Sequence, residues 1–215
     1  MKVMKFGGSS VGSAEAIKQV RDIVTCIDEN VIVVVSAMRG VTDTLLDAAR
    51  MALEGNDTYK DKLTEMAARH QAVISEAVIP DKRREVGDKV MSLFDDLSNI
   101  YKGVYLIRDL SQKTSDAIVS YGERFSSWIM SGAIEGARLV DSRKIIKTHL
   151  YYSRHVVDFA ATDRLISAEF SSHKGIAILP GFIASDIETG YTTTLGRGGS
   201  DYTAAILASA LNASA

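Results

Sequence analysis

The run VIVVVS at residues 31–36 constrains the fold of this chain more than any other stretch. Five β-branched residues in succession favour a strand, and a continuous apolar run indicates that the strand is buried on both faces. A first strand is expected at residues 1–6, followed by two glycines and a helix with Ser13 as its N-cap. The order strand, glycine turn, helix, strand predicts a parallel sheet covered by helices.

Helix patterns dominate residues 42–108. Apolar residues of the second half of this range recur at alternating steps of four and three, which is typical of a helix packed along one seam. Pro80 interrupts the pattern and separates two helices. We therefore expect a helical hairpin over residues 56–108, inserted into the sheet domain or packed beside it, and a further helix at 115–135.

Strand signals return at 138–146 and 175–184, with a helix near 162–171 between them. TTT at 192–194 suggests another strand, and a turn and a helix at 202–211 follow it. The chain has 215 residues and shows no internal repeat or linker, so we expect one domain. The predicted fold is α/β, with a mostly parallel central sheet and helices on both faces.

Composition excludes several classes of protein. The net charge of −2 gives no general attraction to nucleic acid or to an anionic membrane, and no apolar run approaches the ~18 residues of a membrane span. Cys26 is the single cysteine, which fits a reducing cytoplasm. The four histidines show no metal-ligand spacing, so no metal site is expected.

KFGGSS, residues 5–10, combines a lysine with two adjacent glycines between a strand and a helix. Glycines allow a ligand to approach the backbone closely, and amides at the start of a helix attract anions. Lys5, at the end of the strand, can reach the same point. An anion site and an ordinary strand-to-helix turn are equally good interpretations of this motif alone.

A second glycine turn, LGRGGSD, also lies between a strand and a helix. Ser200 can cap that helix, and Asp201 falls in its first turn. Arg197 is different, because a tight turn has no need of a guanidinium. Arginine pairs bidentately with carboxylates and phosphates. Together the two loops suggest an acidic substrate and a phosphate donor at one edge of the sheet.

Two further positions are ambiguous from the residues alone. Ser36 ends the buried strand, and Thr42 can either cap the next helix or bind a ligand. Glu123 in SYGERF lies off the apolar stripe of its helix, which by itself favours a glutamate in solvent.

Five motifs, in order, resemble the catalytic domain of the aspartokinases, which belong to the amino-acid kinase family. They are KFGGSS, VVVSAMRGVTDTLL, VSYGER, LPGFIASD and TTTLGRGGSDYTAA. The resemblance covers the whole chain. It implies the amino-acid kinase fold and phosphorylation of the side-chain carboxylate of L-aspartate by ATP with Mg²⁺. The product would be 4-phospho-L-aspartate, at the first step of lysine, threonine and methionine synthesis. Tyr121 departs from the histidine of many relatives.

The same resemblance implies a role for each matching residue. Lys5 and Asp201 would be catalytic, with Lys5 stabilising charge on the transferring phosphoryl group. The phosphate-binding residues would be Lys5, Phe6, Gly7, Gly8 and Ser9. The aspartate-binding residues would be Ser36, Thr42, Glu123, Arg197, Gly198, Gly199 and Ser200. No base is required, because a carboxylate is already ionised at neutral pH.

Relatives of this kind continue into a nucleotide lobe and ACT-type regulatory domains. We therefore expect residues 1–215 to be the N-terminal, substrate-binding part of a longer protein, inactive alone and homo-oligomeric when complete. Two alternatives remain open. The parent enzyme could phosphorylate glutamate, acetylglutamate, carbamate or UMP, or the chain could bind aspartate without catalysis.

Overall fold

Two four-stranded sheets lie at the centre of the computed structural model, which describes residues 1–152 and 154–213. The first sheet has the order β1-β2-β6-β3, and all of its pairings are parallel. Its strands are β1 (Lys2–Phe6), β2 (Val31–Val35), β6 (Ile176–Pro180) and β3 (Arg138–Leu139). The second sheet is mixed, with the order β5-β4-β7-β8. Its strands are β5 (Arg154–Val157), β4 (Lys147–Tyr151), β7 (Ile183–Asp186) and β8 (Thr192–Thr194).

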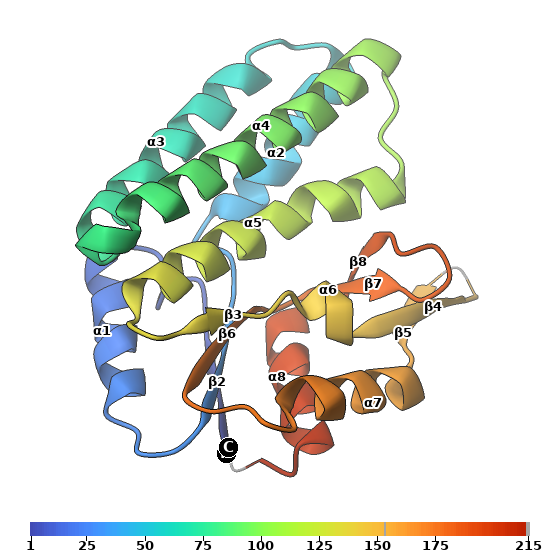
Figure 1. Cartoon of the computed structure of the whole chain (residues 1–215). Helices are drawn as coiled ribbons and strands as arrows, with labels where there is room; N and C mark the ends of the chain where they lie inside the picture. The colour runs from blue at the N-terminus through green and yellow to red at the C-terminus, as the bar shows by residue number, and fades with distance from the viewer. Residues whose placement is uncertain (153, 214–215) are drawn as a thin grey trace.

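Eight α-helices cover the sheets in the described part of the chain. They are α1 (Ala14–Thr25), α2 (Val41–Glu54), α3 (Tyr59–Ala77), α4 (Arg83–Ile107), α5 (Gln112–Ala133), α6 (Ser142–Ile145), α7 (Phe159–Phe170) and α8 (Gly199–Ala210). Figure 1 shows α2, α3 and α4 stacked beyond α5, and α7 and α8 on the other side of the sheets. No helix among the described residues is long and apolar enough to cross a membrane.

Strand β2 separates two hydrophobic cores, as its sequence predicted. All five of its residues are fully buried. Val31, Val33 and Val35 belong to the core formed with α1 to α5. Ile32 and Val34 point the other way, into the core formed with α7 and α8. Helices therefore cover both faces of the parallel sheet, and the predicted α/β fold is confirmed.

The helical hairpin expected at 56–108 is present as α3 and α4, joined by a short 3-10 turn, η1 (Pro80–Lys82). The buried Tyr101 hydroxyl donates to the Leu45 carbonyl oxygen at 2.7 Å and ties α4 to α2. His70 of α3 packs edge-on against Phe94 and Phe125. The hairpin thus packs on α2 and α5.

Two predicted strands are divided in the structure. The range 138–146 contains only the two-residue β3, because the Asp141 side chain caps a short helix, α6, by accepting from the Arg143 amide at 3.1 Å. The range 175–184 breaks after Pro180, where Phe182 adopts a φ of 66° and directs β7 into the second sheet. The hairpin of β4 and β5 was not predicted.

Two possible helix caps are also corrected. Gly198, with a φ of 75°, is the N-cap of α8, so Ser200 is its second residue and not its cap. Gly40, with a φ of 81°, is the N-cap of α2. Thr42 therefore lies inside the first turn of α2, where its side chain is free to face a ligand.

Candidate active site

The glycine loops meet at the carboxyl edge of the parallel sheet, where ligands commonly bind in open α/β folds. β1 ends beside β2, and the Arg39 amide after β2 donates to the Gly8 carbonyl oxygen at 3.0 Å. The Gly181 amide after β6 donates to the Val35 carbonyl oxygen at 2.8 Å. These bonds hold three strand-to-helix or strand-to-strand turns around one point.

A cavity of about 320 Å³ opens at that point. It is lined by Lys5, Ser36, Ala37, Thr42, Glu123, Phe182, Gly196, Arg197, Gly198, Gly199, Ser200 and Asp201. Every residue that the sequence suggested for aspartate binding or catalysis is in this set. Residues from the two ends of the chain and from the middle of α5 are thus brought to one space.

The remaining phosphate-binding candidates lie beside the cavity and do not line it. Phe6 and Ser9 border a separate hollow against α1. Gly7 adjoins Lys5, since a Cβ at Gly7 would lie 3.6 Å from the Lys5 Nζ. Gly8 packs closely against the turn after β2, because a Cβ there would lie only 2.7 Å from the Ala37 carbonyl oxygen.

Lys5 is paired with Asp201 across the cavity wall. The Lys5 Nζ lies 2.9 Å from Asp201 Oδ1, with side-chain exposures of 25% and 71%. Gly198 and Gly199 start α8 close to the end of β1, which places Asp201 in the first helical turn opposite Lys5. The lysine ammonium is therefore oriented while remaining accessible from the cavity.

Glu123 is buried, contrary to the solvated position that its place off the apolar stripe suggested. It is 4% exposed, and Oε1 accepts a hydrogen bond from the Ala37 amide at 3.1 Å. Oε2 is buried and has no hydrogen-bond partner in the structure. Burial raises the pKa of the Glu123 carboxyl to about 7. A buried acceptor without a partner at a cavity wall is suited to a cationic ligand group.

Arg197 lies between Gly196 and Gly198, whose φ angles of 73° and 75° are in the left-handed region that favours glycine. Its side chain is exposed and forms no ion pair with any described residue. The guanidinium is thus free to bind an anion at the open side of the cavity. Glu123 and Arg197 together offer an acceptor for a cation and a donor for an anion.

Three lining residues, Ala37, Phe182 and Gly196, were not identified as site candidates from the sequence. Ala37 contributes its amide to Glu123, and Phe182 forms part of the wall. The Phe182 amide donates to Thr203 Oγ1 at 3.0 Å. A phenylalanine with positive φ has no local sequence signal, so only the surrounding motif LPGFIASD pointed to this segment.

Comparison with known families decides the family. The model described as "Amino acid kinase family" matches residues 1–215. The chain belongs to the amino acid kinase family. Lysine-sensitive aspartokinase 3 of Escherichia coli (strain K12) is 35% identical over 219 residues, covering 99% of this chain and 47% of the relative. The chloroplastic aspartokinase 1 of Arabidopsis thaliana is 31% identical over 221 residues, covering 97% and 38%.

Solved structures give the same family assignment. E. coli aspartokinase III in complex with lysine and aspartate has a TM-score of 0.87 and 32% identity, covering 100% of this chain and 48% of that chain. The same enzyme in complex with aspartate and ADP has a TM-score of 0.85 and 33% identity, covering 100% and 47%. The resemblance to aspartokinases is thereby confirmed, and this amino acid kinase chain spans less than half of their length.

The Lys5 ammonium is a donor of the kind that pairs with phosphate oxygens. A Cβ at Gly7 would be in ordinary contact with Nζ, so the Gly7 backbone lies directly beside the Lys5 ammonium. Among the described residues, no group of three or more His, Cys, Asp or Glu side chains could hold a metal ion. We therefore assign no metal ligands to the described residues.

Proposed function

We propose that this chain is the substrate-binding part of an aspartate kinase. The carrying observation is that one cavity brings together Lys5, Glu123 and Arg197, with an unpartnered buried oxygen on Glu123. L-aspartate carries an ammonium and two carboxylates. Arg197 would bind the α-carboxylate, Glu123 Oε2 would accept from the ammonium, and the side-chain carboxylate would face Lys5.

The reaction would be phosphorylation of that side-chain carboxylate to give 4-phospho-L-aspartate. MgATP would supply the phosphoryl group. A carboxylate oxygen would form the new bond to phosphorus as the bond to the leaving ADP oxygen breaks, and no proton would have to move. Lys5 would stabilise the negative charge that develops on the transferring group, and Asp201 would hold the lysine in place.

The other candidate residues would complete two subsites. Phe6, Gly7, Gly8 and Ser9 would present backbone and hydroxyl donors to phosphate oxygens near Lys5. The remaining aspartate contacts would come from Ser36, Thr42, Gly198, Gly199 and Ser200. We further propose that the enzyme acts in the cytoplasm, at the entry to lysine, threonine and methionine synthesis.

We also propose that these 215 residues do not catalyse the transfer alone. In this proposal the cavity would bind aspartate and the transferring phosphoryl group. We assign none of its residues to binding the nucleoside of ATP. The relative solved with aspartate and ADP extends well beyond the part that this chain covers. The test is release of ADP from ATP by the 215-residue chain. Aspartate-dependent release above background would contradict the proposal.

The experiment for the substrate is isothermal titration of the chain with L-aspartate, L-glutamate, N-acetylglutamate and UMP. Selective binding of aspartate, lost in Arg197→Gln, would support the assignment. Selective binding of another acid would favour a different member of the family. Binding of none, by a chain shown to be folded by circular dichroism, would contradict a preformed aspartate site in these 215 residues.

A further inference from the structure

A second cavity borders α5 through Arg124, Ser127 and Trp128, whereas the first, called the kinase cavity below, borders α5 through Glu123. It has a volume of about 390 Å³, compared with about 320 Å³ for the first, and the two share no lining residue. Helices α4 and α5 form two of its walls, and the segment from β3 to α6 forms the third. Its lining residues are Lys89, Ser92, Leu93, Asp96, Arg124, Ser127, Trp128, Leu139, Asp141, Arg143, Lys144 and Pro180.

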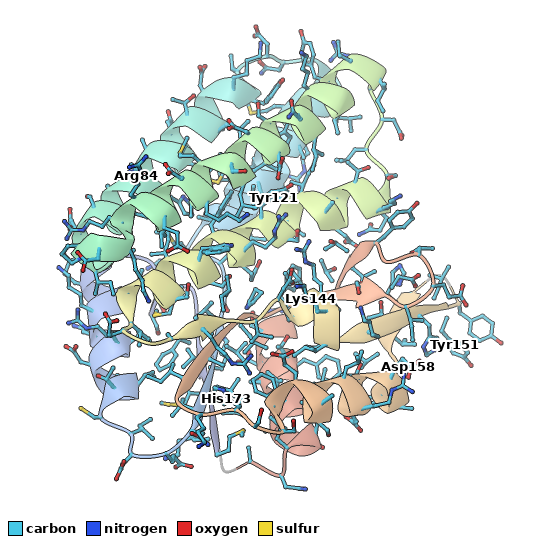
Figure 2. All side chains as sticks on the ribbon, viewed as in Figure 1. Arg84, Tyr121, Lys144, Tyr151, Asp158 and His173 are labelled. Carbon is cyan, nitrogen blue, oxygen red and sulfur yellow. The ribbon has the colours of Figure 1, made fainter. Side chains whose placement is uncertain are left out.

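The cavity has an excess of positive charge. Arg143 is already neutralised, because its Nη2 lies 2.6 Å from Asp141 Oδ2 and its Nε lies 3.0 Å from Asp141 Oδ1. Lys89, Arg124 and Lys144 form no ion pair with any described residue, and Asp96 is the one further acid in the lining. Figure 2 shows Lys144 in the space between α5 and α6. Arg143 and Asp141 cancel, and Asp96 offsets one of the three other cations. The lining residues therefore carry an excess of two positive charges.

Arg124 is held in a position suited to binding. Its guanidinium carbon lies 4.1 Å from the centre of the Tyr121 ring, so the planar group is stacked and oriented. None of its guanidinium N–H groups donates a hydrogen bond to a described residue. A stacked guanidinium keeps its edge available for a carboxylate or a phosphate. Ser92 and Ser127 line the same space, and the Ser127 hydroxyl donates to the Arg124 carbonyl oxygen at 3.0 Å.

The α5 wall that carries Arg124 also carries Trp128, the only tryptophan of the chain. Trp128 is partly exposed, and the Lys89 Nζ lies 5.8 Å from the centre of its ring. Leu93, Leu139 and Pro180 add apolar surface to a lining that is otherwise mostly polar or charged, so a ligand could make both apolar and specific polar contacts. Ligand binding here would change the surroundings of a single fluorescent residue.

We propose that this cavity binds a compact organic dianion, through Arg124, Lys89 and Lys144, at a site separate from the kinase cavity. Two uncompensated positive charges match two negative charges, and the oriented guanidinium selects a planar carboxylate or a phosphate. The site does not depend on the function proposed for the first cavity. Phosphate monoesters and dicarboxylates share the required chemistry, and the experiment distinguishes them.

The test is a titration of the 215-residue chain followed by the emission of Trp128. The probes are glycerol 3-phosphate, succinate and inorganic phosphate, with chloride at equal ionic strength as the reference. We expect a saturable change in emission with glycerol 3-phosphate or with succinate that chloride does not produce. Whichever of the two gives the lower dissociation constant identifies the ligand class.

Variants test the assignment to these residues. Arg124→Gln should weaken the apparent affinity by about tenfold or more, the effect of losing one charge-assisted contact. Lys144→Gln, at an exposed position where folding is not at risk, should weaken it in the same direction. Arg84→Gln removes one positive charge from α4 outside the cavity and should leave the titration unchanged (Figure 2).

Three results would overturn the proposal. One is the absence of a saturable change with every probe in a folded chain. Another is equal affinity in wild type, Arg124→Gln and Lys144→Gln. The third is loss of the change in Arg197→Gln, which would assign the signal to the kinase cavity and not to this one.

Discussion

The Lys5 Nζ lies 2.9 Å from Asp201 Oδ1, although Lys5 is in the strand β1 and Asp201 is in the first turn of the helix α8. Asp201 is 71% exposed, and exposed ion pairs contribute only about 0–1 kcal/mol to stability. The pair is therefore poorly explained as a stabilising contact. Its position on the cavity wall suits the task of orienting the lysine ammonium toward a bound group.

Lys5→Ala in the complete kinase should lower kcat by about 10²–10³ and change the KM for aspartate little. The reason is that Lys5 is assigned to charge that develops mainly in the transition state, and such contacts appear in kcat. Steady-state kinetics with varied aspartate measure both parameters. Asp201→Asn should lower kcat less, because the lysine remains. An unchanged kcat with a raised KM would move Lys5 to substrate binding.

Aspartate affinity should depend on pH through Glu123. The pKa of its carboxyl is raised to about 7 by burial, and the ligand ammonium requires the ionised form. Below pH 7 a proton must be released on binding, so affinity should fall by about tenfold for each further pH unit. Aspartate's own side-chain carboxyl ordinarily titrates near pH 4 and stays ionised in this window. Calorimetry between pH 5.5 and about 8 measures the slope.

Glu123→Gln is the matched control for this pH dependence. The amide keeps the shape of the side chain and can still accept from the Ala37 amide. Affinity should be weaker at pH 8 and nearly constant down to about pH 6. If the variant keeps the wild-type dependence of aspartate affinity on pH, another group causes it. The proposed contact between Glu123 and the ligand ammonium would then be contradicted.

Gly8→Ala should destabilise the chain by about 1–3 kcal/mol, because the new Cβ would lie 2.7 Å from the Ala37 carbonyl oxygen and the backbone must move. The shift would also strain the hydrogen bond from the Arg39 amide to Gly8. Gly103→Ala, inside α4 with nothing within 4 Å of its Cβ, should instead stabilise by about 0.5–1 kcal/mol. Urea unfolding compares the two. Equal stability of Gly8→Ala and wild type would contradict the close packing of these loops.

Acid should destabilise the fold through His70. This histidine is fully buried, its Nδ1–H donates to the Met66 carbonyl oxygen at 2.7 Å, and burial lowers its pKa from 6.5 to about 4. A depressed folded-state pKa means that the full contribution is present above pH 6.5 and is lost as the pH falls toward 4. The loss should be on the order of 3 kcal/mol.

His70→Leu isolates this contribution. The free energy of unfolding, measured in urea between pH 7 and about 4, should fall less steeply in the variant than in wild type. The difference between the two curves removes the contributions of His173 and of the carboxyl groups. Parallel curves would show that His70 is not the group whose protonation is opposed by folding.

The parts of this fold that were predictable have strong local signals. The run 31–35 could only be a doubly buried strand, and Ser13 is an N-cap, accepting from the Ala16 amide at 3.2 Å. Ser36, Thr42 and Glu123 were assigned to a site only through the resemblance to aspartokinases. Lys5 and Arg197 stood out from the residues alone, because a strand-end lysine and an arginine without a structural reason occur in two short glycine motifs. Such residues identify a site wherever the fold brings their turns together.

Strands β4 and β5 of the second sheet were missed because their sequence does not alternate, whereas β8 matches the strand expected at 192–194. Leu150 and Tyr151 of β4 are exposed, so apolar residues there do not mark a buried face. At 175–184 a continuous apolar run conceals the change of direction at Phe182, since phenylalanine rarely adopts positive φ. The burial of Glu123 was likewise invisible, because it depends on the turn after β2, far away in the sequence.

Arg197→Ala should weaken aspartate binding by about tenfold or more, while kcat in the complete kinase changes little. Arg197 is exposed in the ligand-free chain, so its removal leaves no buried charge without a partner. The loss is then that of a charge-assisted hydrogen-bonded pair, about 1.5–3 kcal/mol, and not the larger loss of a desolvated ion pair. The α-carboxylate does not react, so the contact is equal in ground and transition states and appears in binding. Arg197→Lys should recover only part of the affinity, because an ammonium lacks the bidentate fork. Calorimetric titration of wild type and the two variants with aspartate measures the affinities, and circular dichroism establishes that each protein is folded. An affinity of Arg197→Ala within about threefold of wild type would mean that the α-carboxylate is bound by other residues.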